Sequence, residues 1–387
     1  MESIPLTLGV EEEYQIIHPE TRDLHSFVQE FLEQSNQVLP EGTLKPEFMQ
    51  SQIEVGSRVC RNIKEVRHEL QRLRHTVGQL ANNNGLKIAS ASTHPFANWS
   101  AQEITAGDRY KQLLDQMQGV ASQLLIFGFH IHLGLGGDTN NDLKIEVMNQ
   151  LRYFLPHILA LTSSSPFWQG RKTGLKSYRS VIFEMLPRTG MAPVFSSFSE
   201  YDSYVEMLER VGTISKDDNT GKADGTKIWW DIRPHPKFGT LEVRIPDICT
   251  RVEEAVCIAA ILQSLTATLI ELRQNNQSWR IYRSHHIVEN KWRAMRYGIE
   301  GKLVDFGKEQ EIPMSFLAIE IVELVEKQAR ALGCWEEVQY VEKILKEGTS
   351  ADRQIQTYEK SLQDGTSHEE ALQAVVDNLI QETMEGV

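Results

Sequence analysis

A chain of 387 residues with 53 acidic and 40 basic side chains carries a net charge of −13. This charge excludes a general role in nucleic-acid binding, because no basic surface is available to neutralise phosphates. The longest apolar run, LLIFGFHIHLGLGG from Leu124, is too short to span a bilayer and contains two histidines, so we expect no membrane partner.

The cysteines and the N-terminus indicate the compartment. The four cysteines are far apart and form no CxxC pair, which favours free thiols over disulfides or a zinc site. The N-terminus lacks the basic and apolar regions of a secretion signal. We therefore expect a cytoplasmic protein, and the sequence leaves a homo-oligomer open. The cysteines are Cys60, Cys249, Cys257 and Cys334.

Strand and helix patterns alternate up to about residue 250, and the pattern after it is almost entirely helical. We expect one α+β domain over residues 1–387, with a sheet-rich part (1–250) and a helical part (251–387). Helices would pack against a large, mainly antiparallel sheet. The strands are predicted at Leu6–Ile17, Leu44–Glu54, Leu86–Ser92, Leu124–Leu135, Lys227–Ile232 and Thr240–Ile245. The helices before residue 250 are predicted at Ser26–Gln37, Asn62–Asn83, Ala101–Gln118, Asn140–Leu161 and Glu200–Val211.

The first predicted strand contains three consecutive acids, in LGVEEEYQI at Leu8–Ile16. Successive side chains of a strand alternate faces, so Glu11 and Glu13 share one face. Glu12 lies on the other face, where we expect it to serve structure or solubility. Two neighbouring acids on one face repel each other, and burial increases the cost. This strand therefore needs a cation nearby.

Three further strand regions bring polar or charged groups to one face. A lone acid on a strand is typical of an edge or surface, and a lone His130 would be typical of a core histidine. Four strands with such groups instead indicate a shared cavity lined by carboxylates. The groups are Glu47 with Glu54, His130 with His132, and Glu242 with Arg244, followed by Asp247.

Converging carboxylates require cations, because otherwise they would take up protons or push the sheet apart. Carboxylate oxygens with one or two imidazoles suit Mg²⁺ or Mn²⁺. There are more carboxylates than one octahedral ion can use, so we infer two or three ions with a polyphosphate between them. Arg244 would suit a transferring phosphoryl group or the carboxylate that receives it.

Several motifs in fixed order resemble the type 2 glutamate–cysteine ligase family, which includes the YbdK-like carboxylate–amine ligases. The resemblance covers roughly residues 5 to 380 and is strongest to the cyanobacterial glutamate–cysteine ligases. The motifs are LGVEEEYQI, THPFA at Thr93–Ala97, GFHIHLGL, ALTSSSPFWQGRKTGLKSYRS, LPRTG and WWDIRPHPKFGTLEVRIPD.

The resemblance implies a fold related to the catalytic domain of glutamine synthetase, with ATP and divalent ions on the concave side of a curved antiparallel sheet. It also implies a reaction on small-molecule substrates. ATP phosphorylates the γ-carboxylate of glutamate, and the amino group of cysteine attacks the acyl phosphate to give γ-glutamylcysteine, the first step of glutathione synthesis.

The resemblance also assigns residues. Arg244 matches the arginine that steadies the transferring phosphoryl group. His132 stands where related ligases carry other residues, and we place it with the substrate and ATP contacts. The positions that match metal ligands are Glu11, Glu13, Glu47, Glu54, His130 and Glu242.

The segment from Ser163 to Phe198 is rich in Gly, Ser, Pro and Arg. We expect it to close over the substrates and to bring Arg179 and Arg188, although a solvated surface loop would have the same composition. Arg233 is predicted to bind phosphate or the glutamate carboxylate. Trp230 is predicted to contact ATP, against the alternative of a core aromatic residue.

Three functions stay open at this point. The first is glutamate–cysteine ligase, and the second is a carboxylate–amine ligase with the same activation and another amine. The third is a metal-dependent hydrolase in which His130 and His132 hold Zn²⁺, although the additional acids and arginines exceed what it needs. A binding protein without catalysis has no reason to concentrate so many charges on sheet faces.

Overall fold

The computed structural model describes residues 5–36, 38–218 and 220–387. Its central element is a seven-stranded sheet in the order β10-β11-β5-β1-β3-β2, with β4 paired to β1, and neighbouring strands are antiparallel. These strands are β1 (Leu6–Ile17), β2 (Leu44–Pro46), β3 (Gln52–Gly56), β4 (Lys87–Ala89), β5 (Phe129–Leu135), β10 (Ile232–His235) and β11 (Thr240–Val243). Small two-stranded sheets pair β6 (Phe167–Trp168) with β7 (Arg171–Lys172), β8 (Thr189–Gly190) with β9 (Trp229–Trp230), and β12 (Lys302–Asp305) with β13 (Gln310–Pro313).

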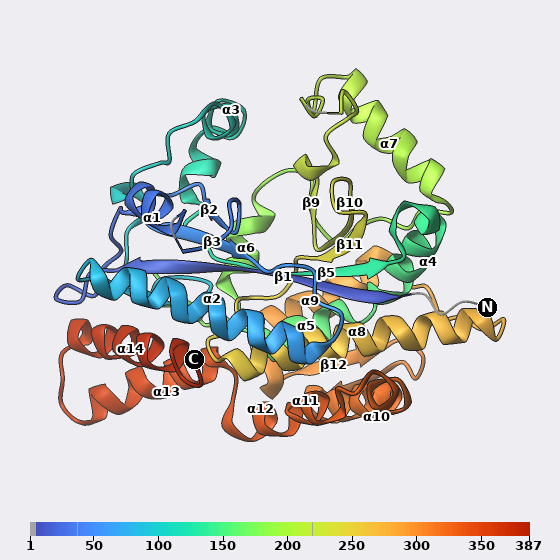
Figure 1. The fold of residues 1–387 in the computed structure, drawn as a ribbon. Helices are drawn as coiled ribbons and strands as arrows, with labels where there is room; N and C mark the ends of the chain where they lie inside the picture. Colours follow the sequence, from blue (N-terminus) through green and yellow to red (C-terminus); the bar gives the residue numbers. More distant parts are fainter. Residues whose placement is uncertain (1–4, 37, 219) are drawn as a thin grey trace.

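The helices lie on both sides of this sheet (Figure 1). Helices α2 and α8 run along one side, and the last helices of the chain lie beyond them, whereas α3 and α7 stand on the opposite side. The first seven helices are α1 (Val28–Ser35), α2 (Ile63–Asn83), α3 (Asp108–Met117), α4 (Asn141–Leu151), α5 (Leu155–Thr162), α6 (Tyr178–Glu184) and α7 (Phe198–Arg210). The others are α8 (Val252–Gln274), α9 (Ser284–Tyr297), α10 (Met314–Leu332), α11 (Trp335–Gln339), α12 (Val341–Glu347), α13 (Ser350–Gln363) and α14 (His368–Thr383).

Helix α2 follows directly from its sequence. Asn62 caps its first turn by accepting a hydrogen bond from the Glu65 amide, and residues three and four apart form its buried apolar stripe. Helix α8 is apolar on all sides, which is typical of a core helix. It is long and apolar enough to cross a bilayer, but 89% of its most apolar window is buried within the protein. These two helices cover the sheet face that carries Glu12.

The predicted α+β class, with an antiparallel sheet and a helical C-terminal region, is confirmed. The division of the chain into domains stays a prediction, although one apolar cluster joins sheet residues to residues of α8, α10 and α12. The predicted strand Leu44–Glu54 is wrong in its middle, where the chain turns between β2 and β3. The predicted helix Asn140–Leu161 is divided into α4 and α5, and Pro156 stands in the first turn of α5. Gln37, the last residue of another predicted helix, lies outside the described residues.

Candidate active site

The register of the sheet brings the predicted acids and histidines to one face. Residues directly opposite each other on antiparallel strands have side chains on the same face. The side chains therefore form rows across β11, β5, β1 and β3 rather than isolated pairs. The opposed pairs are Glu242 with His132, Glu11 with His130, and Glu13 with Glu54.

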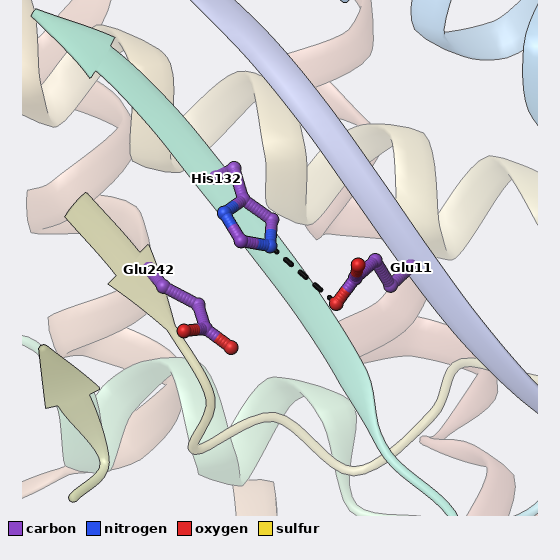
Figure 2. A group of neighbouring side chains, drawn as sticks. All are labelled: Glu11, His132 and Glu242. Atoms are coloured by element: carbon purple, nitrogen blue, oxygen red, sulfur yellow. Dashed lines mark ion pairs between the residues drawn. The ribbon is translucent and has the colours of Figure 1, made fainter. Parts of the chain in front are cut away.

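Glu11, His132 and Glu242 form the first carboxylate group. Each offers one ligand atom, and these atoms lie within 4.8 Å of one another. Figure 2 shows the three side chains converging from β1, β5 and β11. The ring of His132 is oriented by a 2.9 Å hydrogen bond between Nδ1 and Thr240 Oγ1. Its buried Nε2, 3.4 Å from Glu11 Oε2, makes no hydrogen bond and is available to a metal ion.

His130 lies beside this group. Its Nδ1 is 3.5 Å from Glu11 and 3.8 Å from Glu242, and the guanidinium of Arg244 is also 3.5 Å away. Burial and the charge of Arg244 lower the pKa of His130 to about 4, so its imidazole is neutral. The sequence assigned His130 to metal binding and His132 to substrate. In the structure it is His132 that completes the three-residue group.

Glu13, Glu47 and Glu54 form the second carboxylate group, again with ligand atoms within 4.8 Å of one another. Burial and the charge of Glu54 raise the pKa of Glu13 from its ordinary 4.5 to about 7. Burial and the charges of Glu54 and Glu13 raise the pKa of Glu47 well above its usual range. Glu13 and Glu47 thus hold charge at a cost, and a bound cation would relieve it.

Lys45 joins the two groups and was missed by the sequence prediction. It stands opposite Glu54 on β2, and its Nζ lies 2.6 Å from Glu54 and 3.1 Å from Glu11. Burial would lower the pKa of Lys45, but the two carboxylates raise it, so the ammonium is retained. A single lysine near a strand end is normally a surface residue, and only its alternation with Glu47 indicated a shared face.

Two arginines hold Glu242. Arg244 and Arg233 each donate to one of its carboxylate oxygens, Arg233 at 2.7 Å. Burial would raise the pKa of Glu242, but the two guanidinium charges hold it well below its usual range. Arg233 also donates to the carbonyls of Thr226 and Ile228. Arg233 is thus used to position Glu242, and its predicted contact with phosphate or glutamate stays a prediction.

Arg179 reaches the site from α6, within the segment that was expected to close over the substrates. It is 4% exposed and donates to the backbone carbonyls of Arg244 and Ile245. Space for it depends on Gly128: a Cβ there would lie 2.9 Å from the Arg179 guanidinium and 3.0 Å from His130 Nε2. Arg179 thus lies against the strand end that carries Arg244.

Asp247 anchors the segment that was expected to close over the substrates. It accepts hydrogen bonds from the Ser164 amide and from the hydroxyls of Ser165 and Ser177, and all four residues are fully buried. The first half of the segment, which contains the β6–β7 hairpin and the start of α6, is thus fixed to the chain just beyond β11. Composition alone could not separate such a fixed segment from a lid.

The remaining two predicted contacts lie outside the carboxylate groups. Trp230 is 5% exposed and stacks on Tyr204 with ring centroids 5.6 Å apart, as a core aromatic residue does, and its predicted contact with ATP stays a prediction. Arg188 lies 5.2 Å over the Trp229 ring and donates to the Lys227 carbonyl. It is half-buried and makes no ion pair with the described carboxylates.

Mg²⁺ should stabilise the protein more at about pH 8 than at about pH 5.5. The pKa of Glu13 is raised on folding, so its contribution to stability is complete below its unfolded value of 4.5 and is lost as the pH rises through about 7. The melting temperature of the metal-free protein should therefore fall over this range, and Mg²⁺ should restore it. Differential scanning fluorimetry with and without Mg²⁺ measures both effects. An equal shift at both pH values would contradict the cation site.

Comparisons with known proteins find relatives over almost the whole chain. The model of the glutamate–cysteine ligase family 2 matches residues 7–378. A protein of Chloroflexus aurantiacus, provisionally named glutamate–cysteine ligase 2, is 50% identical over 381 residues, which cover 98% of this chain and 93% of that protein. A similarly named protein of Herpetosiphon aurantiacus is 48% identical over 383 residues, 99% of this chain and 94% of that one.

Solved structures share the fold at low sequence identity. A glutamate–cysteine ligase from Francisella tularensis, solved in complex with AMP, matches with a TM-score of 0.66 and 14% identity, covering 100% of this chain and 90% of that one. A bifunctional glutathione synthetase from Pasteurella multocida matches with a TM-score of 0.65 and 15% identity, covering 98% of this chain and 53% of that one.

Proposed function

Because this chain belongs to the glutamate–cysteine ligase family 2, we propose that it is an ATP-dependent ligase that joins the γ-carboxylate of glutamate to the amino group of cysteine. The observation that supports this most is the pair of carboxylate groups on one sheet face, with Arg244 beside them. A ligase of this kind must bring a polyphosphate and a carboxylate together, and both are anions. The metal-dependent hydrolase is not favoured by these relatives.

We assign two Mg²⁺ ions to the site, one to each carboxylate group, with Mn²⁺ as the alternative metal. The ligands would be Glu11, His132 and Glu242 for one ion, and Glu13, Glu47 and Glu54 for the other. The donor set fits, since it is mainly oxygen with one available imidazole nitrogen. When bound, the ions neutralise phosphate charge. Lys45 supplies a fixed positive charge between the two groups.

The protein's own side chains have distinct tasks in this scheme. Arg244 would meet the negative charge on the transferring phosphoryl group, since it lies 11% exposed at the edge of the first group and its buried Nε makes no hydrogen bond. Arg233 fixes the carboxylate of Glu242, and Arg179 fixes the chain that carries Arg244. Arg188, half-buried without an ion pair to a described carboxylate, is a candidate for binding an anionic part of a substrate.

Replacing Arg244 with Lys should lower the turnover number by roughly 10²–10³-fold, because a point charge cannot reproduce a planar guanidinium that serves Glu242 and a phosphoryl oxygen together. Steady-state kinetics at saturating ATP and Mg²⁺ measure the loss. The matched control is Arg293→Lys on α9, which keeps the charge of a half-buried arginine paired with Glu289 and Glu311 outside the carboxylate groups and should leave turnover unchanged. Turnover of Arg244→Lys within a few-fold of the unmodified protein would refute the assigned role.

ADP release with Mg²⁺, ATP and glutamate, measured across a panel of amines and without any amine, tests the proposed function. Stimulation by cysteine, with γ-glutamylcysteine as the product, is the expected result. Stimulation only by another amine would retain the activation step and change the second substrate. ATP turnover with none of them would refute the ligase. We further propose a cytoplasmic location, which the four free and buried cysteines support.

A further inference from the structure

The β10–β11 hairpin carries two aromatic rings beside the first carboxylate group. His235 is the last residue of β10, and Phe238 lies in the turn that follows it. Their rings stack with centroids 4.5 Å apart and planes only 11° from parallel. Both rings meet the ring of His132 edge to face, with centroid distances of 5.2 Å from His235 and 5.4 Å from Phe238. This aromatic pair therefore borders the group that His132 forms with Glu11 and Glu242.

The register of the sheet puts the aromatic pair on the face that carries both carboxylate groups. Glu242 stands opposite His132 on one side and opposite Arg233 on the other. His235 is two residues beyond Arg233 on the same strand, and positions two apart in a strand share a face. The His235 row is therefore about 7 Å from the row of Glu242 and His132. It lies on the side away from the second carboxylate group.

The sheet surface next to the aromatic pair is made of small residues. The positions that stand opposite one another in the His235 row are Thr240 on β11, Gly134 on β5 and Thr7 on β1. A Cβ on Gly134 would collide with the Thr7 hydroxyl, so only glycine fits there. Thr7 and Thr240 are half-buried and keep contact with solvent. No bulky side chain of this row thus stands on the carboxylate face beside the two rings.

Phe238 presents an ordered ring to solvent. It is 59% exposed, although His235 covers one face of its ring. A single exposed apolar residue is common on protein surfaces and by itself indicates no function. Phe238 differs because His235 and His132 both contact its ring, and because its amide donates a 3.2 Å hydrogen bond to His235 Nδ1. A ring that is already fixed loses little conformational entropy when a flat ligand stacks on it.

We propose that Phe238 is the platform on which the base of the bound nucleotide stacks. This inference rests on the proposed ATP-dependent function. A nucleoside triphosphate joins a flat ring to a polyanion, so it needs an aromatic surface at one end and cations at the other. The carboxylate face provides both in that order: Phe238 comes first, then the group with Glu242, then the group with Glu13. The phosphates therefore run from the first carboxylate group toward the second.

Isothermal titration calorimetry of the full chain with two Mg²⁺-bound ligands tests this platform. One is the β,γ-imido analogue of ATP, and the other is inorganic tripolyphosphate, which has the phosphates but no base. Phe238→Ala should weaken the nucleotide analogue about tenfold, because base stacking is lost, and should leave tripolyphosphate within about twofold. Phe238→Trp keeps a flat ring and should bind the analogue within about threefold of the unmodified protein.

A matched control and a kinetic measurement complete the test. Phe316→Ala removes a phenylalanine that is 68% exposed on α10, outside the sheet, and should change neither affinity. In steady-state kinetics, Phe238→Ala should raise the KM for ATP about tenfold, with turnover at saturating ATP within about threefold of normal. A rise in KM that Phe238→Trp reverses would distinguish stacking from a general loss of structure.

Three results would overturn the platform. Equal weakening of both ligands by Phe238→Ala would mean that the ring only supports His132. Unchanged affinity for both would place the base elsewhere, for example at Trp230. Binding of neither ligand by the unmodified protein would refute this proposal and the ATP-dependent function together. The titrations need neither glutamate nor an amine, so a chain that binds the analogue but forms no γ-glutamylcysteine would refute the ligase alone.

Discussion

Replacing Glu13 with Gln is expected to lower the turnover number by about 10²–10³-fold and, at about pH 8, to raise the melting temperature of the metal-free protein. The two effects share one cause. Glu13 is buried beside Glu54, and its pKa of about 7 records the cost of its charge. Glutamine removes that charge but still accepts the 2.7 Å hydrogen bond from the Gly128 amide. The folded state therefore gains stability while the second carboxylate group loses a ligand.

Turnover and thermal stability, measured on the same preparation, check this prediction. Mg²⁺ should shift the melting temperature of Glu13→Gln less than that of the unmodified protein, since one of three carboxylates has lost its charge. A variant with lower stability and normal turnover would mean that Glu13 supports the fold and does not take part in the reaction. Lower turnover with an unchanged Mg²⁺ shift would place Glu13 in the site but outside the metal ligands.

The sheet face that carries both carboxylate groups was predictable because strand alternation depends only on backbone geometry. Glu11 and Glu13 share a face in any regular strand, and the same rule placed Glu242 and the histidines. Which segments pack over each face depends on contacts between residues far apart in the sequence. Strand alternation carries no information about those contacts. The structure places His132, and not His130, in the three-residue group with Glu11 and Glu242, and the Thr240 contact that orients His132 comes from another strand. The predicted roles of the two histidines stay predictions.

The arginines also show what the sequence alone cannot predict, namely the partner of each side chain. A guanidinium can serve a substrate, a carboxylate or a carbonyl, and its sequence neighbours are alike in all three cases. Arg233 was expected at a substrate, and in the structure it holds Glu242 and two carbonyls. The segment from Ser163 to Phe198 was expected to close over the substrates, and its first half is held by Asp247, more than 60 residues away. Such partners become visible only when the chain has folded.

Glu12 is the clearest example of a side chain whose partner the sequence alone did not predict. It differs from Glu13 by one position and lies on the opposite face. Its expected role in solubility is wrong, and its role in structure is confirmed: the side chain is 0% exposed and pairs with Arg74 of α2, which is also 0% exposed. Arg74 donates further to the carbonyls of Cys249 and Thr250. The signal that could have revealed this pair is the place of Arg74 within the apolar stripe of α2.

Replacing Glu12 with Gln should therefore lower the free energy of unfolding by about 3–5 kcal/mol, because it leaves the Arg74 charge buried without a counter-charge. Chemical denaturation measures this loss. Adding Arg74→Met should recover part of it, since removing both charges of a buried pair costs less than removing one. Turnover per folded molecule should stay within about threefold of normal, unlike that of Glu13→Gln. A loss below about 1 kcal/mol would mean that water reaches the pair and screens its charges. The structural role that we assign to Glu12 would then be refuted.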